Sequence, residues 1–226
     1  AHVSSGDRIT KYYYADRNRQ VAVESPLSPH SVSQLDFLGR TVAQAAYSDL
    51  SGFTTIGSTL FDTSIDITGG GSAESGRLTL GTMEYDNLGR VYRSDMHPVV
   101  KSSGQTLTFS ISSYNWYDIA GRTVKTSGSG YAAMEYDRLG RVLRHYTLLG
   151  STDAAPGTSG TLAAAMLVDV NDAVAEERHT IYHEVTGEVE MSVHLSATTT
   201  SAGPIDANTD GDLSIVTRSD LGAASG

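Results

Sequence analysis

The chain has 226 residues, a formal net charge of −10 and no cysteine. With 39% hydrophobic and 19% charged residues it is too apolar for a disordered chain. The negative charge and the scattered Lys and Arg residues argue against a nucleic-acid-binding protein, which needs clustered positive charge. The absence of cysteine excludes disulfide scaffolds, thiolate zinc sites and cysteine nucleophiles. The bias toward Tyr, Ser, Thr and Gly is typical of an all-β protein with many short strands.

Outside the repeated motif described next, strands are predicted in chain order at residues 9–12, 60–67, 106–112, 162–177 and 212–217. The segment 162–177 is rich in alanine and also fits a helical turn or two. We interpret it as a strand because its counterpart, residues 60–67, has a strand pattern. The longest apolar run, residues 162–170, contains Asp169 and is too short to span a bilayer, so no membrane span is expected.

A short motif recurs along the chain: an apolar or aromatic strand, the turn Asp-x-x-Gly-Arg, and a strand that begins with a β-branched residue. A variant without the tyrosine contains Asp36, Gly39 and Arg40, and weaker copies contain Asp16, Glu184 and Asp220. The complete copies are Tyr85-Asp86-x-x-Gly89-Arg90, Tyr117-Asp118-x-x-Gly121-Arg122 and Tyr136-Asp137-x-x-Gly140-Arg141.

The spacing of these motifs predicts a duplication. Motifs three places apart in the series are separated by about 100 residues, as are Tyr47 and Tyr146. We therefore expect two super-repeats, residues 1–117 and 118–226, that together form one continuous β array.

Turn chemistry explains why the motif should form a hairpin without any ligand. Aspartate at the first position of a type I turn accepts a hydrogen bond from the backbone two residues on. Glycine at the fourth position supplies the left-handed conformation of a bulge. The arginine opens the returning strand, where it can lie over a tyrosine ring or pair with a carboxylate of a neighbouring hairpin.

At these residues the sequence resembles the YD-repeat (Rhs) family, whose signature Tyr-Asp-x-x-Gly-Arg recurs about every twenty residues. The resemblance covers residues 7–222, with insertions. It implies a long sheet of hairpins that spirals or wraps. In bacterial Rhs proteins and insecticidal toxin-complex subunits such a sheet forms a hollow shell around a toxin domain, and teneurins use a similar barrel in cell adhesion. The chain lacks the family's autocleavage region and is shorter than a shell requires, so a closed shell made by this chain alone is not expected.

One segment suggests a calcium site. Asp206, Asn208, Asp210 and Asp212 place oxygen ligands at alternate positions, with Gly211 sixth, as in the first half of a calcium loop. An EF-hand would end in a glutamate where this chain has Thr217, and a turn rich in polar residues is the alternative interpretation.

Other chemistry has weaker support. His179 and His183 have a spacing that could hold zinc on a helix, but on a strand they would stand about 13 Å apart. The sequence contains no nucleophile elbow, P-loop or dinucleotide-binding fingerprint. We therefore expect a protein that is not an enzyme.

These observations lead to two functional hypotheses. The first is a structural protein, secreted or on a bacterial cell surface, whose sheet extends into a fibre, tube or sheath through identical subunits or further repeats. The second is a piece of an Rhs-like shell or a teneurin-like adhesin, whose function belongs to the longer protein. Binding of surface glycans by exposed Tyr residues and Trp116 is a third and weaker alternative.

Overall fold

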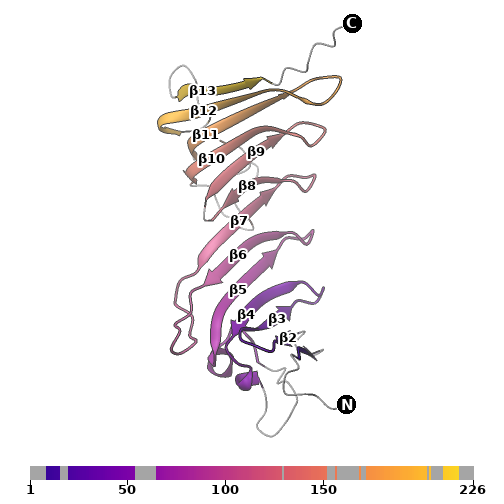
Figure 1. Cartoon of the computed structure of the whole chain (residues 1–226), viewed down its shortest axis with the longest axis vertical. Helices are drawn as coiled ribbons and strands as arrows, with labels where there is room; N and C mark the ends of the chain where they lie inside the picture. Colours follow the sequence, from indigo (N-terminus) through magenta and orange to yellow (C-terminus); the bar gives the residue numbers. More distant parts are fainter. Residues whose placement is uncertain are drawn as a thin grey trace. The chain divides into compact units, whose positions relative to one another are not determined.

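The computed structural model of the chain is all-β, with antiparallel strands that follow one another in sequence (Figure 1). It describes residues 9–15, 20–53, 65–128, 130–151, 172–202 and 211–218, together with positions 156, 168 and 204. In 197–202 and 211–218 only the backbone is described. The chain divides into two compact units, Ala1–Ser112 and Ser113–Gly226. The predicted fold class is confirmed, whereas the two super-repeats stay a prediction.

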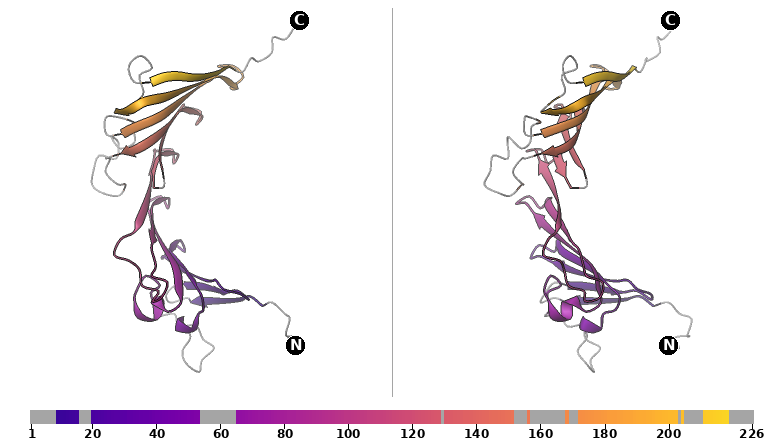
Figure 2. Two further views of the ribbon diagram at one scale, coloured as in Figure 1. Left: turned by 60° about the vertical axis from the view of Figure 1, so that its left-hand side comes forward. Right: turned by 90° about the vertical axis from the view of Figure 1, so that its left-hand side faces the viewer.

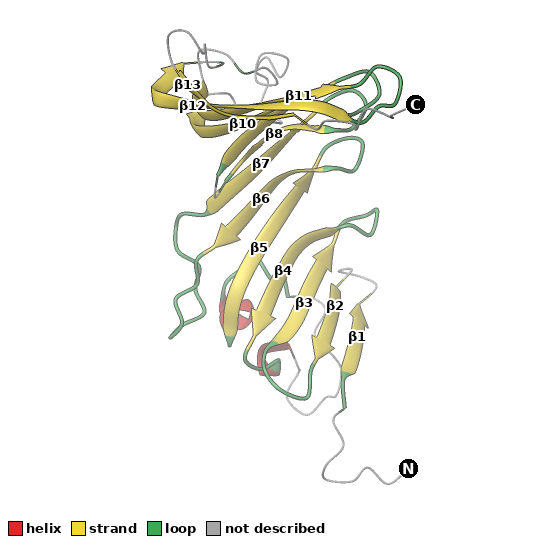
Figure 3. Ribbon diagram, turned by 45° about the horizontal axis from the view of Figure 1, so that its top comes forward, coloured by secondary structure: helices red, strands yellow, loops and turns green. Residues whose placement is uncertain are grey.

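The first unit is an antiparallel meander in which each strand pairs with the next. Two short 3₁₀ helices, η1 (Ser51–Phe53) and η2 (Gly71–Glu74), lie in the connection between its fourth and fifth strands and are red in Figure 3. Its strands are β1 (Lys11–Ala15), β2 (Gln20–Glu24), β3 (His30–Leu35), β4 (Thr41–Tyr47), β5 (Arg77–Tyr85) and β6 (Val91–His97).

The second unit is also an antiparallel meander, and three of its strands are the longest in the described part of the chain (Figure 2). Its strands are β7 (Ile111–Tyr117), which begins just before the unit boundary, β8 (Thr123–Ser127), β9 (Tyr131–Tyr136), β10 (Val142–Ser151), β11 (Asp172–Tyr182), β12 (Val189–Ala202) and β13 (Gly211–Arg218).

The core of the first unit contains one row of apolar side chains. Across four strands the register aligns the buried residues Ala22, Val32, Ala45 and Leu80. Phe53 of η1 belongs to the same core and packs edge-on against Tyr47, with ring centroids 4.9 Å apart. Burial raises the pKa of Tyr47 to about 12, and its hydroxyl donates to the carbonyl of Ala73 in η2.

A buried arginine also holds the loops of the first unit together. The Arg77 side chain is almost fully enclosed and donates hydrogen bonds to the carbonyls of Ile67, Gly69 and Gly104. Carbonyl groups that would otherwise face apolar surroundings thus gain charge-assisted donors.

The core of the second unit combines apolar and charged residues. Tyr146, Leu148, Val174 and Leu195 form its apolar part. The equivalent register row contains two ionic side chains, Lys125 and Glu177. The Lys125 Nζ atom lies 2.5 Å from a carboxylate oxygen of Asp172, with both side chains buried, and Glu177 pairs with His179. Removing one member of a buried pair leaves an uncompensated charge, so these pairs constrain the packing.

Several predicted strands differ from the structure. The predicted strand 106–112 is wrong over most of its length, because β7 begins only at Ile111. Within 106–110 the only pairing is an isolated antiparallel bridge between Thr106 and Val99, beside which the backbone of Leu107 donates to Pro98. For 60–67, the described residues 65–67 are turn or irregular, and the rest lies outside the described residues.

The other predicted strands agree better with the structure. β13 covers 212–217, β1 overlaps 9–12, and β11 covers the described end of 162–177. No helix in the described part of the chain is both long and apolar enough to cross a membrane.

The core of the first unit gives a matched pair of phenylalanines for a stability measurement. Replacing Phe53, which is fully buried, by Ala should lower the free energy of unfolding by about 3–5 kcal/mol, because a cavity remains beneath η1. Replacing Phe37, which is 90% exposed, by Ala should change it by less than about 0.5 kcal/mol. Denaturant unfolding of the two variants measures this, and equal losses would contradict the assigned core.

Candidate functional site

The recurring motifs form a set of near-identical turns at the ends of the hairpins. In each, the backbone N–H of the aspartate donates to the carbonyl of the arginine, and the glycine N–H donates to the aspartate carbonyl. Glycine is required at the fourth position because its φ lies near +80°, in the left-handed region. The turns close β3–β4 at Asp36, β5–β6 at Asp86, β7–β8 at Asp118 and β9–β10 at Asp137.

Each turn aspartate is engaged within its own turn. In the turn at Asp86, for example, Oδ1 accepts the backbone N–H groups of Leu88 and Arg90, both at 2.9 Å, and Oδ2 accepts Arg90 Nε at 2.6 Å. Desolvation acts to raise the pKa of these carboxyls, but the hydrogen bonds and charge of the arginine outweigh it. The pKa is therefore lowered for Asp36, Asp86, Asp118 and Asp137.

In the turn between β11 and β12, a histidine takes the place of the aspartate that accepts the backbone N–H groups of the turn. His183 occupies the place of the aspartate, and its Nδ1 accepts the backbone N–H groups of Val185 and Thr186. Gly187 supplies the positive φ, and Glu188 stands where the other turns have arginine. This turn is one residue longer than the others, because Gly187 lies four residues after His183 and not three. Glu184, which the sequence spacing places at the aspartate position, is therefore not the residue that caps the turn.

Successive hairpins contact each other through the arginine of one turn and the tyrosine that precedes the next. The guanidinium carbon lies 4.4 Å from the ring centre for Arg40 and Tyr85, 4.6 Å for Arg122 and Tyr136, and 4.2 Å for Arg141 and Tyr182. Such distances give cation–π attraction. We call each such pair an Arg–Tyr contact.

Hydrogen bonds fix each Arg–Tyr contact at one further point in the first unit and at two in the second. The tyrosine hydroxyl donates to a carbonyl of the preceding hairpin: Tyr85 to Thr41 at 2.8 Å, Tyr136 to Thr123 at 2.8 Å and Tyr182 to Val142 at 3.0 Å. In the second unit the arginine also reaches the next turn, from Arg122 Nη1 to the carbonyl of Asp137 and from Arg141 Nη1 to that of Gly187. The stacked ring and guanidinium, together with these hydrogen bonds to backbone carbonyls, hold adjacent turns in contact.

The remaining motif residues lie where the turn requires them. Arg90 pairs with Asp86 as its counterparts do, Gly121 has a φ of 85°, and Tyr117 ends β7 directly before its turn. Within each unit, these turns lie at the same end of the strands (Figure 1).

Sequence reasoning missed one regular feature of the turns, a large aliphatic side chain at each tip. These side chains are at least 73% exposed, although turn positions usually favour polar residues. The signal was available in the sequence as an apolar residue one or two positions after the aspartate at Asp36, Asp86, Asp118 and Asp137. The tip residues are Leu38 and Leu88 in the first unit and Ile119, Leu139 and Val185 in the second.

The two metal hypotheses have different outcomes. Asp206, Asn208 and Asp210 lie outside the described residues, and Asp212 falls in β13 without a described side chain, so calcium binding stays a prediction. Of the two histidines considered for zinc, His179 pairs with Glu177 on β11 while His183 caps the turn that follows. Among the described residues no group of three or more His, Asp or Glu side chains could hold a metal ion.

A double-mutant cycle can measure the Arg–Tyr contact. We expect Arg141→Gln and Tyr182→Leu to show a coupling energy of about 0.5–1 kcal/mol in denaturant unfolding, because each substitution removes the same contact. Arg138→Gln is the matched control, since Arg138 is exposed on the same turn. Its cycle with Tyr182→Leu should be additive, and equal coupling in both cycles would contradict the contact.

The turn carboxyls also predict a pH dependence. A carboxyl whose pKa is lowered by folding contributes stability above its unfolded pKa, about 3.9, and loses it as the pH falls through the lower folded value. Asp137→Asn should therefore be less stable than the wild type at pH 7, and this difference should shrink below about pH 4. Glu188→Gln, which changes an exposed carboxyl, is the control; a difference for Asp137→Asn that does not vary with pH would refute the assignment.

No protein-family model matches the chain, and no curated protein sequence gives a significant match. A function for the chain is therefore inferred from its turns and from the contacts between them.

Proposed function

We propose that the chain is a structural, non-enzymatic protein of the YD-repeat type, secreted or on the cell surface, whose hairpin array extends or self-assembles into a fibre, tube or sheath. The observation that carries the proposal is the Arg–Tyr contact, which recurs between successive hairpins with distances of 4.2–4.6 Å. It joins two different surfaces, the arginine side of one turn and the tyrosine side of the next. A contact of this head-to-tail kind can propagate through an array.

The first strand of the first unit supports extension at an edge. Within the described residues β1 pairs with β2 alone, so one side of its backbone has no strand partner. Tyr12 and Tyr14 are 60% and 73% exposed on this strand. An edge strand with large exposed side chains is a template for pairing with another strand.

The aliphatic tips support a role in contacts with other surfaces. Exposed aliphatic residues at the tips of the motif turns lower the solubility of a dispersed monomer. At the tip with Leu88, the neighbouring Asp86 and Arg90 pair with each other, so a second array could approach this tip without meeting either charge unpaired.

The state of the turn carboxylates favours a structural role over a catalytic one. A general base needs a free lone pair directed toward a substrate. In the turn at Asp137, the carboxylate already accepts the N–H groups of Leu139 and Arg141 and the Arg141 guanidinium.

Sedimentation velocity and negative-stain electron microscopy of the full chain test self-assembly. We expect the wild type to form species that grow with protein concentration. Tyr14→Lys should raise the concentration needed by at least about tenfold, because a charge on an edge strand opposes pairing. Leu27→Lys, at an exposed position outside the strands, is the matched control and should assemble like the wild type.

A stable, dispersed wild-type monomer at all concentrations would overturn self-assembly and would favour the shell or adhesin alternative. If neither Tyr14→Lys nor Leu27→Lys changes the concentration needed for assembly, the β1 edge is not the contact between subunits. Circular dichroism of each variant confirms that the sheet is retained.

A further inference from the structure

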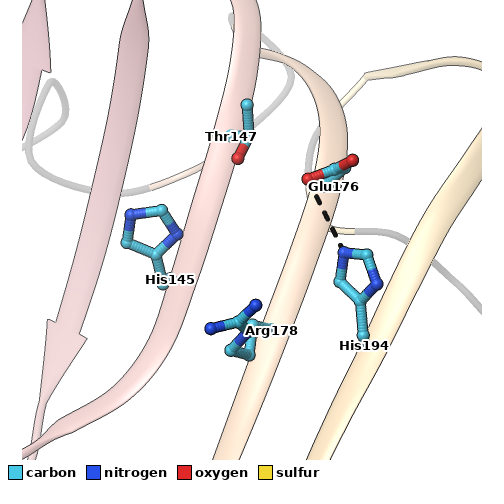
Figure 4. Close-up of a pocket in the computed structure, with 5 residues that line it drawn as sticks. All are labelled: His145, Thr147, Glu176, Arg178 and His194. Atoms are coloured by element: carbon cyan, nitrogen blue, oxygen red, sulfur yellow. Dashed lines mark ion pairs between the residues drawn. The ribbon is translucent and has the colours of Figure 1, made fainter. Parts of the chain in front are cut away.

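The second unit has a hollow on the face of the sheet opposite its core. Tyr146 of β10, Glu177 of β11 and Leu195 of β12 are buried in the core. Because side chains alternate along a strand, their sequence neighbours point to the other face. There a cavity of about 120 Å³ is lined by His145, Thr147, Glu176, Arg178 and His194 (Figure 4). Its volume is several times that needed by one water molecule.

The strand register brings the basic residues together. His145 is paired with Arg178, and Arg178 with His194, so the three side chains form one row across β10, β11 and β12. Thr147 and Glu176 form the neighbouring row. Strand spacing of about 4.8 Å places Arg178 between the two imidazoles, and positions built on strands are held more firmly than positions on loops.

The arginine at the centre has unused donors. Within the described residues, neither Arg178 nor His145 takes part in a hydrogen bond, ion pair or ring contact. Glu176 is instead directed to His194, with Oε2 and Nε2 3.6 Å apart (Figure 4). The strongest donor of the hollow is therefore open to a ligand, while the acidic group beside it has a partner.

We propose that this hollow binds a single oxyanion group, held by the Arg178 guanidinium with the His145 imidazole and the Thr147 hydroxyl as further donors. A guanidinium presents paired N–H groups that match two oxygens of a phosphate, sulfate or carboxylate. The arginine repels a metal cation, and one arginine with two imidazoles suits one anionic group rather than a nucleic-acid backbone. The site lies away from the turns, so it does not depend on assembly of the array.

Titration of the full chain with sodium sulfate, sodium phosphate or sodium acetate tests the proposal, by isothermal calorimetry and by amide chemical shifts, at ionic strength held constant with chloride. We expect saturable binding with shifts confined to β10–β12. Tighter binding of sulfate and phosphate than of acetate would identify a tetrahedral anion, and the reverse order would identify a carboxylate ligand.

Three variants separate a specific site from general charge attraction. Arg178→Gln should weaken sulfate binding by at least about tenfold, because charge-assisted hydrogen bonds are lost. Arg138→Gln removes the same charge from an exposed position outside the hollow and should leave binding unchanged. Glu176→Gln removes the one acidic side chain of the lining and should strengthen binding severalfold.

Two results would overturn the proposal. The first is the absence of saturable binding of all three anions by the folded wild type. The second is equal weakening by Arg178→Gln and Arg138→Gln, which would indicate charge attraction without a site. Because Arg178 and Glu176 are exposed and outside the core, both variants should fold, and the opposite signs of their effects cannot arise from a general loss of stability.

Discussion

The contact between the arginine of one turn and the tyrosine of the next is the interaction on which the array depends. Backbone pairing holds neighbouring strands at a fixed distance, but it does not decide how one hairpin end lies on another. The arginine does this because a single guanidinium binds its own aspartate, lies over the next tyrosine ring and, in the second unit, reaches the next turn's backbone. A lysine ammonium has no planar fork and could not make these contacts together. The motif therefore encodes both a turn and its attachment to the following turn.

The two units use the same architecture with different core chemistry. In the first, apolar residues of the sheet pack together with Phe53 of a helical turn, and the buried Arg77 donates hydrogen bonds to loop carbonyls. In the second, a lysine in the sheet pairs with Asp172. Buried ions contribute little net stability when paired but are costly when left alone, so each pair makes one arrangement of strands and loops strongly preferred. In the first unit, the hydrogen bonds of Arg77 also join the loops at Ile67, Gly69 and Gly104 to the sheet.

In the second unit, the core and the proposed oxyanion site lie on opposite faces of the sheet. One face packs the core, the opposite face carries the hollow around Arg178, and the turns lie at the strand ends. Because side chains point alternately to the two faces, neighbouring residues such as Tyr146 and His145 serve different purposes without competing for space. A structural array can thus carry a binding site on a face that its own packing does not use.

The sequence by itself determined the all-β class and the positions of the turns at Asp36, Asp86, Asp118 and Asp137, because turn chemistry involves residues that are close in sequence. It predicted a strand over 106–112 where the structure has only an isolated bridge between Val99 and Thr106 before Ile111, and it did not reveal the capping role of His183. Only the tertiary structure decided the pairing of Lys125 with Asp172, the burial of Arg77 and the row of basic residues across β10–β12. These features join residues distant in sequence. They follow from strand register and loop packing, which local propensities do not specify.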